Sequence, residues 1–313
     1  MSGKVSRPLT SIRVSCEARC ADKYSRDLQY STGNLVSVTF SESSCWLGRA
    51  SMFVYAPTDT FSLAITGIQL LNLGAFANEM KSPTPYSKFA EKTAASGGAM
   101  IPSRQGMLLI YVPAMLTSAA CLATAPAIGN GREILVGALL LAHFAKRVFE
   151  TLFVHVYSGS TSAPVAGFIG VYYALIALLI SSQQNHVPAG FYAKASGDAI
   201  LVAGLAAFAV GQAGNFYHHY RLAAMRREPH PQGAKYVVPS GGMFELVTMP
   251  HYTFEILAWV GIALCCQQLN AVLVALGMGS YLSGRAVATT AWYKERFGKA
   301  WPEERRHLVP YVF

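Results

Sequence analysis

The segment 143–155, HFAKRVFETLFVH, places ionisable side chains inside an apolar stretch of the chain. His143, Lys146 or Arg147, and Glu150 recur at helical spacing, so they share one face of a helix. Ionisable groups inside the lipid phase are costly unless they are paired or hydrated, which makes them candidates for function. We interpret this face as the wall of a cavity for an anionic ligand. The alternative is a Lys146–Glu150 pair that marks a helix end at the membrane surface.

A second polar stripe occurs in the segment 214–227, GNFYHHYRLAAMRR. Asn215, His219 and Arg226 lie four and then seven residues apart, again on one helix face. An amide, an imidazole and a guanidinium in a row suit a phosphorylated or nucleotide ligand, because arginine grips phosphate with a planar fork. The alternative is a basic helix end whose arginines reach the membrane surface, but this leaves the deeper Asn215 unexplained.

The third candidate lies in the segment 236–259, YVVPSGGMFELVTMPHYTFEILAW. Tyr252 and Glu255 are three residues apart, and His251 and Glu255 are four apart, so a helix would point them the same way. A carboxylate or imidazole beside a phenol can orient it as a proton donor. The alternative is an aromatic belt of Tyr252 and Trp259, which leaves Glu255 without a role.

The composition places these segments in a membrane. Of 313 residues, 52% are hydrophobic and only 13% are charged, with a net charge of +9. Soluble proteins carry about 25% charged residues, so an ordinary soluble enzyme and a disordered chain are both excluded. The basic residues lie between long apolar stretches, which is typical of membrane-flanking loops and not of a nucleic-acid binder.

The apolar stretches predict an all-α, polytopic membrane helical bundle. Six are long enough to cross a bilayer as helices: 60–78, 105–131, 134–156, 164–182, 199–220 and 256–284. A seventh crossing results if the last stretch folds back near residues 267–270. The closely spaced glycines Gly129 and Gly131, and Gly277 and Gly279, do not complete a GxGxxG motif and do not follow a strand. No Rossmann domain is therefore expected.

Other catalytic classes find little support in the sequence. The only close histidine pair is His218–His219, whereas membrane di-iron sites need several closely spaced histidines. The six cysteines show no zinc spacing, and no GxSxG nucleophile elbow is present. We therefore expect neither a metal centre nor a hydrolase.

Taken together, the polar segments resemble the steroid 5α-reductase family, and particularly its branch near very-long-chain trans-2-enoyl-CoA reductases. The resemblance is carried by five segments between residues 79 and 313: SRQGMLLIYVPA (103–114), HFAKRVFETLFVHVYSG (143–159), GNFYHHYRLAAMR (214–226), residues 236–259, and the ending WYKERFGKAWPEERRHLVPYVF (292–313).

This resemblance implies an oxidoreductase that uses NADPH to reduce a carbon–carbon double bond conjugated to a carbonyl. The substrate would be a lipid enone or enoyl thioester, and the enzyme would be a multi-pass protein of the endoplasmic reticulum membrane, with fatty-acid elongation partners. It also implies one membrane-embedded reductase domain over 52–313, with its cofactor-binding part at about 134–313. Residues 1–51, rich in Ser and Arg, are expected to be a disordered extension.

The resemblance also assigns roles to particular positions. The expected catalytic residues, among which Glu255 comes from its spacing alone, are Tyr252, Lys146, Glu255 and Glu79. The expected cofactor-binding residues are Asn215, His219, Arg226, Tyr293 and Arg285. Glu79 lies where the steroid branch carries a carboxylate, but without that branch's aromatic-Gln-Glu context. Thr289 and Thr290 replace histidines of the steroid enzymes, which favours an enoyl or other lipid enone.

Two other functions remain open at this point. A membrane methyltransferase of the isoprenylcysteine type, using S-adenosylmethionine, also combines a glycine turn, a Pro-His-Tyr-like segment and a following Glu. The segments HFAKR and GNFYHH favour the reductase. The other is a non-catalytic lipid-binding protein, which gives little reason to retain costly polar stripes in lipid.

Overall fold

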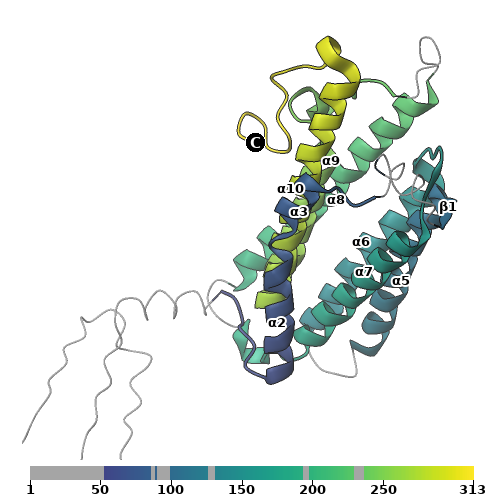
Figure 1. Cartoon of the computed structure of the whole chain (residues 1–313). Helices are drawn as coiled ribbons and strands as arrows, with labels where there is room; N and C mark the ends of the chain where they lie inside the picture. The colour runs from purple at the N-terminus through teal and green to yellow at the C-terminus, as the bar shows by residue number, and fades with distance from the viewer. Residues whose placement is uncertain (1–52, 86–88, 90–98, 126–130, 193–196, 229–235) are drawn as a thin grey trace, which may run out of the picture. The chain divides into compact units, whose positions relative to one another are not determined.

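The computed structural model describes residues 53–85, 89, 99–125, 131–192, 197–228 and 236–313. Over these residues the chain is mostly helical (Figure 1). The helices are α2 (Thr60–Asn72), α3 (Ala75–Lys81), α5 (Ser103–Thr124), α6 (Gly131–Phe149), α7 (Ala163–Gln184), α8 (Gly197–Arg227), α9 (Pro250–Cys266) and α10 (Leu269–Phe297), with short turns η4 (Glu150–Val154), η5 (Ala189–Phe191), η7 (Gly242–Glu245) and η8 (Gly298–Ala300). The predicted all-α class is confirmed, whereas the predicted extension 1–51 lies outside the described residues.

Two three-residue strands, β1 (Met100–Pro102) and β2 (Ser160–Ser162), form the sheet structure of the described part of the chain. They pair antiparallel, with Ile101 opposite Thr161, and tie the start of α5 to the start of α7. No Rossmann domain is found among the described residues, as expected.

Five stretches of helix are long and apolar enough to cross a membrane: Thr60–Lys81, Ser103–Thr124, Ala163–Gln184, Asp198–Arg227 and Leu269–Ala300. The predicted crossing 134–156 is not among these five: α6, which covers its first part, carries Lys146 and Arg147 in its last turn. Helix α9 has 17 residues. Outward-facing positions on the spanning helices are apolar, as at Leu71, Phe168 and Val202. Apolar faces of this kind are suited to contact with lipid. The number of candidate spanning helices agrees roughly with the six or seven expected.

The last long apolar stretch folds back where the sequence suggested. Helix α9 ends at Cys266, Gln267 adopts a left-handed backbone with φ of 49°, and α10 begins at Leu269. The turn is held by Tyr55, whose backbone nitrogen bonds the Gln267 carbonyl at 2.8 Å and whose carbonyl accepts from Leu269 at 2.9 Å. The single apolar stretch therefore yields two antiparallel helices.

Helices α8 and α9 pack closely because glycines remove side chains from their interface. A Cβ at Gly211 would meet the backbone of Ala258, and a Cβ at Gly261 would meet the backbone of Phe208. This close approach brings the second half of α8 against the start of α9, so residues from both segments can reach the same site.

Helix α6 does not end in a regular α-turn. It passes into the π-turn η4, where the His155 backbone nitrogen donates to the Glu150 carbonyl at 2.8 Å. A π-turn holds more residues per turn than an α-helix and is frequent at functional sites. It changes the direction in which Glu150 and the residues after it project.

Candidate active site

A cavity of about 220 Å³ lies among α5, α6, the segment after η4, α7, α8, α9 and α10. Its lining is rich in polar and ionisable side chains: Tyr111, Arg147, His155, Tyr157, Asn215, His219, Arg226, Tyr236, His251, Tyr252 and Glu255. Such a concave site with converging polar groups is the usual form of a small-molecule site.

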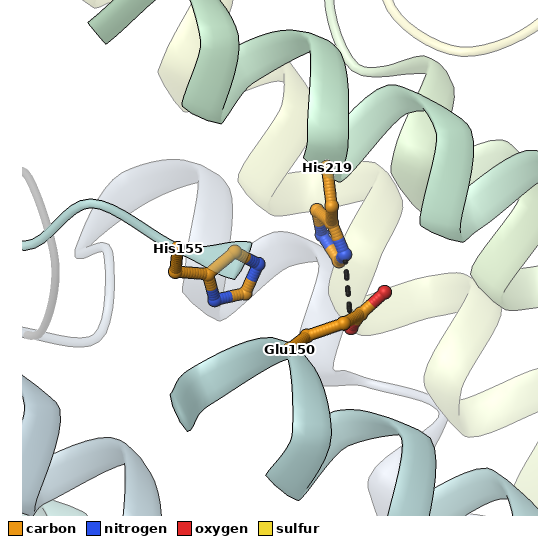
Figure 2. Close-up of side chains that lie close together, drawn as sticks. All are labelled: Glu150, His155 and His219. Atoms are coloured by element: carbon orange, nitrogen blue, oxygen red, sulfur yellow. Dashed lines mark hydrogen bonds and ion pairs between the residues drawn. The ribbon is translucent and has the colours of Figure 1, made fainter. Parts of the chain in front are cut away.

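Glu150 is the centre of a buried ionic cluster beside this cavity. Its side chain is fully buried and lies 2.5 Å from Arg147 and 3.2 Å from Lys146. His219 of α8 approaches the same carboxylate at 3.2 Å (Figure 2). A buried carboxylate needs such compensation, because leaving a charge unpaired in a low-dielectric interior is strongly unfavourable.

Glu150, His155 and His219 could also be considered as metal ligands, since one ligand atom from each lies within 4.8 Å of the others (Figure 2). However, one guanidinium nitrogen of Arg147 is 2.5 Å from Glu150 Oε2 and 2.9 Å from His219 Nδ1. Arginine stays protonated in proteins, so a divalent ion placed there would meet a fixed positive charge. The group is better described as an ionic cluster, and the absence of a metal stays a prediction.

His155 follows η4, outside the candidate membrane spans, and its Nδ1 lies 2.9 Å from the Tyr157 hydroxyl. Burial, and after it the charge of Arg147, lower the pKa of His155 to about 3. The imidazole is therefore neutral near pH 7, and it packs edge-on against His219 with ring centroids 4.8 Å apart.

A chain of hydrogen bonds joins α6, α8 and α9 across the site. Lys146 donates to the side-chain oxygen of Asn215, and the Asn215 amide nitrogen donates to the His251 carbonyl at 2.8 Å. Asn215 is 1% exposed. The alternative of a basic helix end at the membrane surface does not account for Asn215, because this residue links three helices from a buried position.

Glu255 and Tyr252 both line the cavity, but Glu255 is held by a partner on another helix. His143 of α6 lies 3.3 Å from Glu255, and Gln212 of α8 lies 2.8 Å from the other nitrogen of His143. Tyr252 instead neighbours His251, with ring centroids 4.7 Å apart. Of the two orienting groups considered from the sequence, His251 is thus shown to lie against the Tyr252 ring.

Arg226 lies at the exposed end of α8 and lines the cavity, where it donates to the Val156 carbonyl at 2.7 Å. Arg227, the next residue, donates to the Val154 carbonyl at 2.9 Å. The two arginines therefore hold the end of η4 and the residues directly after it against α8.

Glu79 and Arg285 form a separate buried pair on α3 and α10, at 2.5 Å, and each is 1% exposed. The Thr84 hydroxyl also donates to Glu79, at 2.6 Å. Tyr293 is buried as well, with its ring stacked on Trp301 at 5.1 Å. None of these three predicted site residues is among the described residues that line the cavity, so their catalytic and cofactor roles stay predictions.

The other six predicted residues are brought together. Tyr252, Glu255, Asn215, His219 and Arg226 line the cavity, and Lys146 bonds Asn215 at its edge. Sequence reasoning missed Tyr111, His155, Tyr157 and Gln212. Gln212 lies three residues before Asn215, so helical spacing was a signal for it. His155 follows a π-turn, and α-helical spacing does not describe its position.

Comparison with known proteins identifies the relatives. Residues 161–313 match the family model described as 3-oxo-5-alpha-steroid 4-dehydrogenase. The chain is 31% identical over 172 residues to a very-long-chain enoyl-CoA reductase of Dictyostelium discoideum, covering 54% of this chain and 55% of that protein. It is 28% identical over 250 residues to the 3-oxo-5-alpha-steroid 4-dehydrogenase 2 of Sus scrofa, covering 78% and 94%.

A third relative is the probable very-long-chain enoyl-CoA reductase art-1 of Caenorhabditis elegans, 30% identical over 179 residues, covering 54% of this chain and 56% of that protein. The chain thus spans about half the length of the enoyl-CoA reductases it matches. The resemblance to the steroid 5α-reductase family, with its enoyl-CoA reductase branch, is confirmed. The spanning helices and these relatives together indicate a multi-pass membrane protein.

Proposed function

We propose that this chain, which matches the steroid 5α-reductase family over residues 161–313, reduces a carbon–carbon double bond conjugated to a carbonyl in a lipid. The relatives are named enoyl-CoA reductases and 3-oxo-5-alpha-steroid 4-dehydrogenases, and their common chemistry is reduction of such a bond. The observation that carries the proposal is one cavity lined both by Tyr252 and Glu255 and by Asn215, His219 and Arg226.

Several lining side chains suit parts of a reduced nicotinamide dinucleotide. Arg226 offers a guanidinium at the exposed end of α8, suited to phosphate, while Asn215 and His219 offer polar groups deeper on the same helix. When bound, NADPH supplies the hydride that the reaction needs. Arg226 would hold its phosphates, and Asn215, fixed by Lys146 and the His251 carbonyl, would hold its inner end.

Tyr252 is the proposed proton donor. Addition of a hydride to the β-carbon moves the electron pair of the double bond toward the carbonyl oxygen as an enolate, and reduction is completed by a proton at the α-carbon. His251 packs against the Tyr252 ring and orients it, while Glu255, held by His143, places a carboxylate in the same cavity. A positioned acid of this kind contributes about 10²–10⁴-fold to rate.

The names of the relatives and the family resemblance also guide our proposals for location, substrate and partners. We propose a multi-pass location in the endoplasmic reticulum membrane, a lipid enone or enoyl thioester as substrate, and fatty-acid elongation partners. Thr289 and Thr290, which replace histidines of the steroid branch, favour an enoyl thioester or another lipid enone over a steroid.

The test uses the purified full chain in detergent with NADPH and three substrates: a trans-2-enoyl-CoA, a 4-en-3-one steroid and a polyprenol. Loss of absorbance at 340 nm with the enoyl-CoA or the steroid is the expected result, and loss with the polyprenol alone, which has no conjugated carbonyl, would contradict the proposal. No oxidation with any substrate, together with tight S-adenosylmethionine binding, would favour the methyltransferase instead.

Two variants assign the roles. Tyr252→Phe should lower turnover by about 10²-fold or more while NADPH binding stays near normal; Tyr220→Phe, at an exposed tyrosine of α8, is the matched control. Arg226→Ala should chiefly weaken NADPH binding. Its control is Arg221→Ala on the same helix, where the arginine bonds the Ser240 carbonyl and does not line the cavity.

A further inference from the structure

Tyr111 of α5 is a second phenol of the cavity, and it is held unusually firmly. One Arg147 nitrogen donates to its hydroxyl oxygen at 2.6 Å. The Arg147 guanidinium also lies over its ring, with the central carbon 4.7 Å from the centroid. The ring stacks on Tyr173 of α7, with centroids 6.1 Å apart and an interplanar angle of 13°. The ring and hydroxyl of Tyr111 are thus both fixed by neighbours.

The direction of the Arg147 bond decides what the hydroxyl can do. A guanidinium has only donors, so the Tyr111 oxygen must accept and its own proton must point elsewhere. In the described part of the chain, no acceptor for that proton is recorded, and Tyr111 lines the cavity. A hydroxyl that accepts a charge-assisted bond also becomes a better donor, because hydrogen bonds in a chain polarise one another.

Arg147 is itself kept in place from the far side. Its other terminal nitrogen lies 2.5 Å from Glu150 and 2.9 Å from His219, so both sides of the guanidinium have fixed partners. The ionic cluster around Glu150 therefore fixes Arg147, and Arg147 in turn holds the Tyr111 hydroxyl in one orientation at the cavity wall.

We propose that Tyr111 donates a hydrogen bond to the carbonyl oxygen of the substrate, with Arg147 as its positioning residue. The inference rests on the proposed reduction, and it assigns two different roles in that reaction to Tyr111 and Tyr252. The Tyr111 O–H bond stays intact while its hydrogen bond to oxygen strengthens as the enolate charge develops. Tyr252 gives up the proton that forms the new C–H bond at the α-carbon. Donors aimed at such a developing oxyanion contribute about 10²–10³-fold to rate.

The test is single-turnover reduction by the full chain with NADPH already bound. Tyr111→Phe keeps the ring and removes the donor, so we expect the rate of NADPH oxidation to fall about 10²–10³-fold, with NADPH affinity changed less than about threefold. The control is Tyr172→Phe on α7, which packs against the core and does not line the cavity. This variant should react at the rate of the unmodified protein.

Arg147 is tested by its coupling to Tyr111. Arg147→Lys keeps the positive charge beside Glu150 but lacks the planar fork that reaches Tyr111 and Glu150 together. It should slow the reaction when made alone and add little to the loss in Tyr111→Phe. Additive losses would give Arg147 a role independent of Tyr111 and would overturn that part of the proposal.

Three outcomes separate this inference from the proposed function. A full rate in Tyr111→Phe, with an active unmodified protein, overturns the inference and leaves the reductase intact. Parallel loss of rate and of NADPH binding in Tyr111→Phe shows a structural tyrosine and also overturns it. An unmodified protein that oxidises no NADPH with any enone removes the proposed function itself.

Discussion

Two buried carboxylates with similar partners lie in different settings. Glu150 is fully buried, Glu79 is 1% exposed, and each lies 2.5 Å from an arginine. Glu150 also contacts Lys146 and His219, and its cluster borders the cavity. Glu79 is paired with Arg285 and bonded by Thr84, away from the cavity lining. Burial and an ion pair alone therefore do not show whether a carboxylate has a functional or a structural role. The position of its partners relative to the cavity is the difference that the following variants test.

The largest effect is expected at Glu150. Glu150→Gln leaves Lys146 and Arg147 close together without their shared counter-charge. Removing one partner of a buried pair costs about 3–5 kcal/mol, and here the positions of Asn215 and Tyr111 depend on the same two cations. We expect a large fall in thermal unfolding midpoint and a loss of turnover. Normal turnover in this variant would show that the cluster is no more functional than the Glu79 pair.

The Glu79–Arg285 pair should lose stability but allow rescue. Glu79→Gln alone should destabilise by about 3–5 kcal/mol because it leaves a buried guanidinium uncompensated. Adding Arg285→Met replaces the pair by apolar volume and should restore most of the unfolding midpoint, with unchanged NADPH affinity. The readout is thermal unfolding together with NADPH titration. A tenfold weaker affinity in the stable double variant would instead support the cofactor role that the sequence suggested for Arg285.

A smaller effect is expected from pH at His155. Its pKa is about 3 in the folded protein against 6.5 as the ordinary value, so the folded state favours the neutral imidazole. This stabilisation is complete above pH 6.5 and is lost as the pH falls from there toward 3, by about 1.4 kcal/mol per pH unit. His155→Gln should therefore flatten the decline in unfolding midpoint between pH 7 and 5. An identical decline in both proteins would contradict the lowered pKa of His155.

No effect is expected from chelation. Because Arg147 lies against both Glu150 and His219, turnover should be the same after treatment with EDTA and after subsequent addition of zinc. Loss of turnover on chelation with recovery on adding metal would mean that Arg147 moves aside for an ion.

Much of the fold and part of the site could be predicted from the sequence. Apolar length and helical spacing are local properties, and they suffice for the spans, for the turn at Gln267 and for the faces that carry Asn215 and Tyr252. Contacts between distant segments are not local. Glu79 pairs with Arg285, which lies 206 residues away, and Arg147 pairs with Tyr111 on another helix. Both pairings depend on how the helices pack against one another.

The central claim is that this cavity directs hydride to the β-carbon of a conjugated lipid carbonyl. Its most direct test is to supply NADPH deuterated at the transferable C4 position with a trans-2-enoyl-CoA, and to locate the label in the product by mass spectrometry. We predict one deuterium at the β-carbon, with formation slowed strongly in Tyr252→Phe. A product without deuterium at that carbon, or labelled product formed equally fast by the variant, would contradict the account.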